Sequence, residues 1–152
     1  MIKRITNPEE FRTMVDDLDE LFLTENLSLG HAFDLIHDTE SIKNNFANKH
    51  LLAWDVFVWA NKEAGKHDAV GIFVRDKNVK FGKDLFVEFI WLSKNPKVGF
   101  KILKTATNFA REQGFEYILI SSVENTPNSE SNKVFYEKLG FVKDETTFIG
   151  KL

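Results

Sequence analysis

An aromatic hydroxyl at the end of a short helix is the first feature of this sequence that could take part in chemistry. In residues 132–141 (NKVFYEKLGF) apolar side chains recur at helical spacing, and Gly140 stands where a glycine ends a helix in the left-handed conformation. Tyr136 therefore lies on the last turn of a firmly terminated helix, and Phe141 is placed to fold back on Phe135 or Tyr136. The alternative is a tyrosine that only packs at the helix end.

A second candidate site lies where a strand is followed by a helix. Residues 85–92 (LFVEFIWL) are typical of a largely buried strand, and after Pro96 the apolar residues change to a helical period that ends at Gly114. A short loop with Gly99 in the first helical turn can offer backbone N–H groups to a phosphate. Residues 94–104 hold four lysines and no acid, which also favours an anion. A solvated lysine face on an ordinary helix is the alternative.

These two segments resemble the signatures of the GCN5-related N-acetyltransferase (GNAT) superfamily. Residues 136–141 are similar to the family's YEKLGF signature. Residues 94–99 partly match its pyrophosphate turn, in which Gln or Arg is followed by two residues, Gly, one residue, and Gly or Ala. Gly99 fits the last position, but Lys97 replaces the earlier glycine and Lys94 stands where Gln or Arg is usual. The lysine side chain at position 97 would crowd a ligand.

The resemblance implies an acetyl-CoA-dependent N-acyltransferase in which a bound amine attacks directly. Tyr136 would protonate the departing thiolate, and a strand N–H near Trp91 or Leu92 would polarise the thioester carbonyl. In relatives an asparagine seven residues before the tyrosine often contacts the pantetheine arm, and Ser129 occupies that position here. Helix capping explains a polar residue there equally well. The expected cofactor-binding residues are Trp91, Leu92, Lys94, Lys97, Val98, Gly99, Phe100, Lys101, Asn128 and Asn132.

The general base is less clearly indicated. Glu88 is the one acid in the otherwise apolar strand, where an unpaired carboxylate is costly to bury. Family members often place a catalytic glutamate on this strand, so the resemblance implies that Glu88 removes the amine proton directly or through water. An ion pair with a nearby Lys or Arg, or a solvent-facing position, is the alternative. Asp55 is a weaker candidate.

Composition narrows the function classes. The 152 residues suit one domain spanning residues 1–152, and 43% hydrophobic with 28% charged residues is ordinary for a globular protein. The absence of cysteine excludes disulfides and thiolate nucleophiles, and the four histidines show no metal-ligand spacing. A net charge of −3 does not indicate the basic surface that is typical of nucleic-acid-binding proteins. No membrane-spanning segment is apparent in the sequence. We therefore expect a cytoplasmic protein without a metal, a nucleic-acid partner or a membrane partner.

The charge is unevenly distributed along the chain. Residues 9–40 contain ten acids and one base, whereas the expected phosphate turn is basic. With the family's geometry this asymmetry favours a cationic amine as the acceptor substrate. Solvated acidic helix faces explain it equally well.

The order of the expected elements is β-α-α-β-β-β-α-β-α-β(-β), which is the GNAT order over the whole chain. The predicted fold class is α/β, with a mixed, mostly antiparallel central sheet flanked by helices. Parallel pairing is expected only between the strands at 85–93 and 117–121, because a long helix joins them. The other expected elements are a strand at Ile2–Ile5, a helix after Asn7, a helical region at 31–46, hairpin strands at 51–60 and 69–75, and a final strand or hairpin at 141–152.

A different class of function is also compatible with the sequence. Lys97 in place of a glycine favours a GNAT-fold protein that binds coenzyme A weakly or not at all and acts as an interaction module. Transfer of a longer acyl group is a third option. The sequence does not decide the oligomeric state, and a homodimer is compatible with it.

Overall fold

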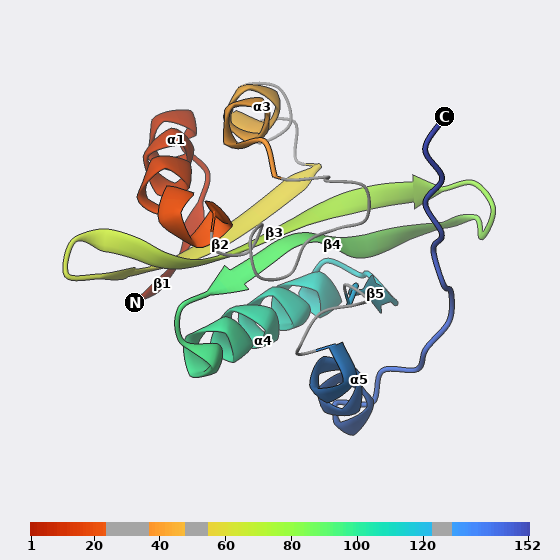
Figure 1. Cartoon of the computed structure of the whole chain (residues 1–152). Helices are drawn as coiled ribbons and strands as arrows, with labels where there is room; N and C mark the ends of the chain where they lie inside the picture. Colours follow the sequence, from red (N-terminus) through yellow and green to blue (C-terminus); the bar gives the residue numbers. More distant parts are fainter. Residues whose placement is uncertain (24–36, 48–54, 123–128) are drawn as a thin grey trace. The chain divides into compact units, whose positions relative to one another are not determined.

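The computed structural model describes residues 1–23, 37–47, 55–122 and 129–152 (Figure 1). The chain divides into two compact units, one made of residues 1–22 and 38–120 and the other of residues 23–37 and 121–152. The elements of the first unit are β1 (Ile2–Ile5), α1 (Pro8–Asp17), α3 (Thr39–Asn45), β2 (Val56–Glu63), β3 (Lys66–Asn78), β4 (Lys83–Ser93), α4 (Pro96–Glu112) and β5 (Ile118–Leu119). The second unit contains α5 (Ser129–Lys138).

The sheet follows the predicted pairing. Within the described ranges it has five strands in the order β1-β2-β3-β4-β5. Neighbours from β1 to β4 are antiparallel, and β4 pairs in parallel with β5 through Phe86 with Ile118 and Val87 with Leu119. This confirms a mixed, mostly antiparallel sheet whose parallel pair is the one joined through a long helix.

Each face of the sheet carries its own apolar core. Helices α1 and α3 lie on one face (Figure 1), where the core includes Phe11 of α1 together with Val58 and Ile72 of the sheet. Helix α4 covers the other face, where Ile102 packs with a cluster of aromatic strand residues that includes Phe73. Side chains alternate between faces along a strand, so β2 and β3 supply both cores. No helix in the described part of the chain is long and apolar enough to span a membrane.

A β-bulge interrupts the regular pairing of β3 with β4. Ile72 pairs with Ile90, but the next residue, Phe73, pairs with Glu88, so Phe89 is an extra residue on β4. Antiparallel partners share a face. Glu88 therefore lies on the α4 face opposite Phe73, and Ile90 lies on the α1 and α3 face opposite Ile72.

Helix α1 is fixed to the β2–β3 hairpin by a polar contact. His67 Nδ1 lies 2.7 Å from Asp17 Oδ2, and the His67 backbone N–H donates to the same oxygen at 3.2 Å. The His67 side chain is buried. Burial alone would raise the pKa of Asp17, but the hydrogen bonds from His67 outweigh it and the pKa is lowered.

Several predicted element bounds were wrong. Residues 141–152 form no strand. Strand β3 covers Lys66–Asn78, where a strand at 69–75 was expected, and β5 covers only Ile118–Leu119 of the expected 117–121. Of the helical region at 31–46 the structure describes α3 and its flanking residues, and 31–36 lie outside the described residues, as do 51–54 of the expected strand at 51–60.

Candidate functional site

The strand-to-helix junction contains only Lys94 and Asn95, and Asn95 caps α4. The Asn95 side-chain oxygen accepts the Lys97 N–H at 3.0 Å. The Asn95 backbone carbonyl accepts the N–H groups of Val98 at 3.0 Å and Gly99 at 3.1 Å. Each of these backbone donors thus already has an acceptor within the protein. An anion bound to the Lys97 N–H would have to replace the Asn95 side chain as its acceptor.

Gly99 packs against the end of β4. A Cβ built on Gly99 would lie 3.0 Å from Ser93 Cβ and 3.6 Å from Trp91 Nε1. The Trp91 indole N–H donates to the Gly99 carbonyl at 2.9 Å. The Ser93 hydroxyl donates to the Asn95 carbonyl and accepts the Asn95 N–H at 3.1 Å. The structure thus explains Gly99 by a close approach of helix and strand, and it adds Ser93 and Asn95 to the residues that shape this turn.

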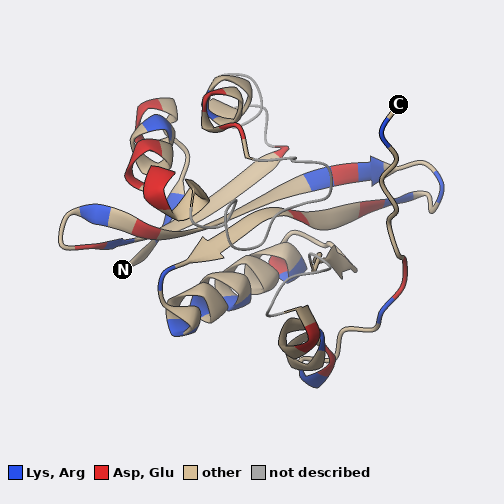
Figure 2. Ribbon diagram, viewed as in Figure 1, with Lys and Arg blue, Asp and Glu red and all other residues tan. Residues whose placement is uncertain are grey.

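A row of lysines marks the start of α4 (Figure 2). Lys94, Lys97, Lys101 and Lys104 are all exposed, and their ammonium groups form no ion pair within the described ranges. Positions 97, 101 and 104 share one side of the helix, because residues three and four apart are neighbours on a helix surface. Among the other expected cofactor residues, Phe100 is partly exposed and Leu92 is buried in the core under α1 and α3. The local charge would favour an anionic ligand.

The edge of β4 beside this turn has no strand partner among the described residues after Val87. Pairing with β5 stops at Val87 and Leu119, although β4 continues to Ser93. The bulge at Phe89 falls in the half of β4 that pairs with β3 but not with β5, and a bulged residue is left out of the ladder. Glu88 is partly buried at the same edge, on the α4 face.

The predicted helix end at Gly140 is confirmed in the second unit. Gly140 has φ of 91°, its N–H donates to the Glu137 carbonyl at 3.0 Å, and the Phe141 N–H donates to the Tyr136 carbonyl at 3.0 Å. These are the two bonds of a Schellman motif. The Phe141 ring packs edge-on against Tyr136, with 6.1 Å between centroids. The Tyr136 hydroxyl lies 3.5 Å from the Ser121 carbonyl, at the outer limit of a hydrogen bond.

The remaining expected residues are distributed as follows. Asn132 is exposed on α5, and Asn128 lies outside the described residues. Ser129, the first residue of α5, is buried. Asp55 immediately precedes β2 and accepts the Arg75 N–H through its backbone carbonyl at 2.8 Å. In the described part of the chain, no three His, Cys, Asp or Glu residues are grouped in a way that could hold a metal ion.

Comparisons with known proteins place this geometry in context. No family model and no curated protein matches the sequence. Solved structures do match over the whole chain. An aminoglycoside acetyltransferase from an uncultured soil metagenomic sample, in complex with sisomicin, is 14% identical, with a TM-score of 0.68 over 100% of this chain and 95% of that one.

Two further solved structures also match over the whole chain. A ribosomal-protein-alanine N-acetyltransferase from Brucella melitensis biovar Abortus 2308 is 8% identical, with a TM-score of 0.68 over 100% of this chain and 99% of that one. An acetyltransferase from Trypanosoma brucei is 14% identical, with a TM-score of 0.67 over the same shares of the two chains. With the strand order and the parallel β4–β5 pair, these likenesses establish that the chain has the fold of the GCN5-related N-acetyltransferases.

Proposed function

We propose that this chain is an acetyl-CoA-dependent N-acyltransferase that acetylates a primary amine of a small molecule or peptide. The observation that carries the proposal is the β4 edge, where parallel pairing with β5 ends at Val87 while the strand continues to Ser93 beside the start of α4. An extended pantetheine arm could pair with this edge as a strand would. We also propose that residues 1–152 form one catalytic domain.

The lysines at the start of α4 support binding of a polyanionic cofactor. Lys94, Lys97 and Lys101 are exposed and form no ion pair among the described residues, so their charge is available to a pyrophosphate. The backbone N–H groups fit less well, because Asn95 already accepts those of Lys97, Val98 and Gly99. In this protein the lysine side chains would therefore contribute more of the phosphate binding than the turn backbone.

When bound, acetyl-CoA supplies the acetyl group as a thioester. The acceptor nitrogen would form a bond to the acetyl carbon while the carbon–sulfur bond breaks. Glu88 would accept the proton that the amine loses, and Tyr136 would donate a proton from its phenolic oxygen to the departing sulfur. A backbone N–H near Trp91 or Leu92 would stabilise the charge that develops on the carbonyl oxygen.

A cationic acceptor remains part of the proposal. It is supported by the acidic N-terminal region and by the sisomicin bound to the aminoglycoside acetyltransferase from the soil sample. The acids on α1 contribute little to this argument, because several already have basic partners. Asp16 pairs with Lys43 at 2.8 Å, and Asp17 contacts His67.

A second candidate function is favoured by the capping of α4. If Asn95 keeps its hydrogen bonds and Lys97 blocks the turn, the protein would bind coenzyme A weakly and would act as an interaction module. A thermal-shift titration with acetyl-CoA separates the two candidates, because a ligand that binds only the folded state raises the melting temperature. An unchanged melting temperature at high acetyl-CoA would favour the interaction module.

The catalytic part of the proposal is tested by replacing Tyr136 with phenylalanine in acetylation assays, after a screen of amine acceptors that begins with cationic ones. Loss of a general acid should slow turnover by about a hundred- to ten-thousand-fold. The acetyl-CoA thermal shift should be unchanged, because the ring and its packing are kept. Tyr117 is the only other tyrosine, so Tyr117→Phe is the matched control and should acetylate normally. If Tyr136→Phe also turns over at the wild-type rate, Tyr136 is a packing residue.

A further inference from the structure

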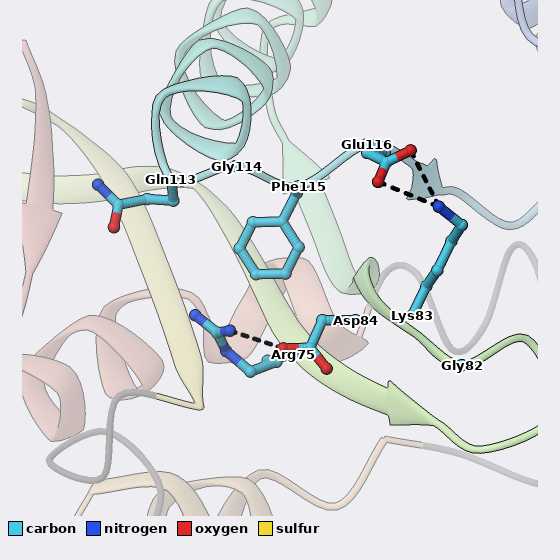
Figure 3. Close-up of a pocket in the computed structure, with 8 residues that line it drawn as sticks. All are labelled: Arg75, Gly82, Lys83, Asp84, Gln113, Gly114, Phe115 and Glu116. Atoms are coloured by element: carbon cyan, nitrogen blue, oxygen red, sulfur yellow. Dashed lines mark hydrogen bonds and ion pairs between the residues drawn. The ribbon is translucent and has the colours of Figure 1, made fainter.

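A pocket of about 430 Å³ lies where the β3–β4 hairpin meets the turn between α4 and β5 (Figure 3). Its volume falls within the roughly 300–1,000 Å³ of pockets that hold small molecules. The lining is strongly polar and includes four charged side chains around one phenyl ring. The lining residues are Arg75, Gly82, Lys83, Asp84, Gln113, Gly114, Phe115 and Glu116.

This pocket is separate from the proposed cofactor turn. The turn lies at the start of α4, whereas Gln113 follows the helix's last residue. At about 1.5 Å per residue, the 17 residues of α4 separate the two places by about 25 Å. A molecule bound in the pocket would therefore not occupy the site proposed for acetyl transfer.

The charges of the pocket form two ion pairs (Figure 3). An Arg75 guanidinium nitrogen lies 2.9 Å from an Asp84 oxygen, and the Lys83 ammonium lies 3.0 Å from both Glu116 oxygens. The four charges sum to zero, so a ligand of one charge gains little net attraction. A ligand that carries both charges can meet an opposite charge at each end. Partly exposed ion pairs contribute little stability, so exchanging them for ligand contacts costs little.

The pocket also has hydrogen-bonding groups to spare. A guanidinium has five N–H donors. Arg75 donates to Asp84 with one nitrogen. The Arg75 Cζ lies over the Phe115 ring, 4.8 Å from the ring centre. The Gln113 side chain points away from the Phe115 ring and from both ion pairs (Figure 3). Around Gly82 and Gly114, a Cβ would meet no atom within 4 Å. Donors, acceptors and space are thus available together.

We propose that this pocket binds a free α-amino acid in its zwitterionic form. The ligand carboxylate would take the planar N–H donors of Arg75. The ligand ammonium would take the carboxylates of Asp84 and Glu116. Neither a simple anion nor a simple cation satisfies both halves of this arrangement.

Titration of the full chain with a panel of proteinogenic amino acids, followed by amide NMR, tests the proposal. We expect saturable shifts at Gly82, Gly114 and Glu116 with at least one amino acid. Its N-acetyl derivative and its amide each keep one charge, and each should bind at least about tenfold more weakly, as expected when a charge-assisted contact is lost. The double variant Asp84→Asn/Glu116→Gln should weaken binding similarly. Glu112→Gln, which removes an acid just outside the lining, should not.

Three results would each overturn the proposal. One is that no amino acid in the panel gives saturable shifts at the pocket. Another is that the N-acetyl derivative or the amide binds as tightly as the parent amino acid, which would show a site for a single charge. The third is that the double variant binds like the wild type while its spectrum elsewhere is unchanged.

Discussion

Replacing Gly99 with alanine tests whether this glycine serves packing or phosphate binding. The new Cβ would lie 3.0 Å from Ser93 Cβ and 3.5 Å from Ser93 Oγ. Ser93 Cβ is attached directly to the strand backbone, so it cannot rotate away. Either α4 or the end of β4 must shift, and the hydrogen bond from the Trp91 indole to the Gly99 carbonyl would be strained.

Two opposing effects determine the size of the change. Overpacking a tight contact costs about 1–3 kcal/mol. Alanine inside a helix is favoured over glycine by about 0.5–1 kcal/mol. We therefore expect Gly99→Ala to lower the free energy of unfolding by about 1 kcal/mol, within a range of about 0–2.5 kcal/mol. For a chain of this size each 1 kcal/mol corresponds to a melting-temperature decrease of about 2–4 °C.

Urea unfolding of Gly99→Ala with and without acetyl-CoA is the assay, combined with changes at Ser93. Ser93→Gly removes the clashing Cβ, so the Gly99→Ala cost should largely disappear in that background. Ser93→Ala is the matched control, because it deletes the hydroxyl but keeps the Cβ, and the cost should remain. If Gly99→Ala is as stable as the wild type, and only its acetyl-CoA-dependent stabilisation is lost, then the packing interpretation is refuted in favour of a phosphate contact.

Three further predictions concern stability, each measured by urea unfolding. Gly71→Ala should lower the free energy of unfolding by about 1–3 kcal/mol, since its Cβ would lie 2.6 Å from Ile102 Cγ2. An unchanged free energy of unfolding would show that α4 can move away. Gly140→Ala should cost about 1–2 kcal/mol because of the φ of 91°, with Gly150→Ala as the neutral control. The lowered pKa of Asp17 contributes stability at pH values above its ordinary value of 3.8, and this is lost as pH falls through the folded-state pKa. The advantage of the wild type over Asp17→Asn should therefore shrink below about pH 4, and a constant difference would contradict this.

Local signals in the sequence predicted local structure well. The helix expected after Asn7 is confirmed, with the Asn7 side chain accepting the N–H groups of Glu9 and Glu10, and so is the helix end at Gly140. In each case the residues that interact lie within a few positions of each other, so the local sequence alone identifies the contact. The parallel β4–β5 pair could also be predicted, because chain topology restricts which strands a helix can join.

Features that depend on distant contacts were not predictable in the same way. The bulge at Phe89 has no glycine or proline to mark it, and its position depends on the pairing of β4 with β3. The role of Gly99 depends on how closely α4 approaches Ser93, which no spacing in the sequence reveals. The final strand or hairpin expected at 141–152 did not form, and nearly all of these residues are exposed, so they bury no apolar face that would hold a strand in place.

The bulge at Phe89 gives β4 one residue more than a regular ladder with β3 needs. Because strand side chains alternate, deleting Phe89 would let Glu88 and Ile90 pair as consecutive residues with Phe73 and Ile72, and every later β4 side chain would keep its face. Trp91 would stay on the face that α4 covers, where its indole donates to the Gly99 carbonyl. Substitutions at Phe89 can also be absorbed, since this residue is 47% exposed. In a randomised library, position 89 should therefore accept many side chains and also a gap, whereas a deletion later in β4 would move the following side chains to the opposite face.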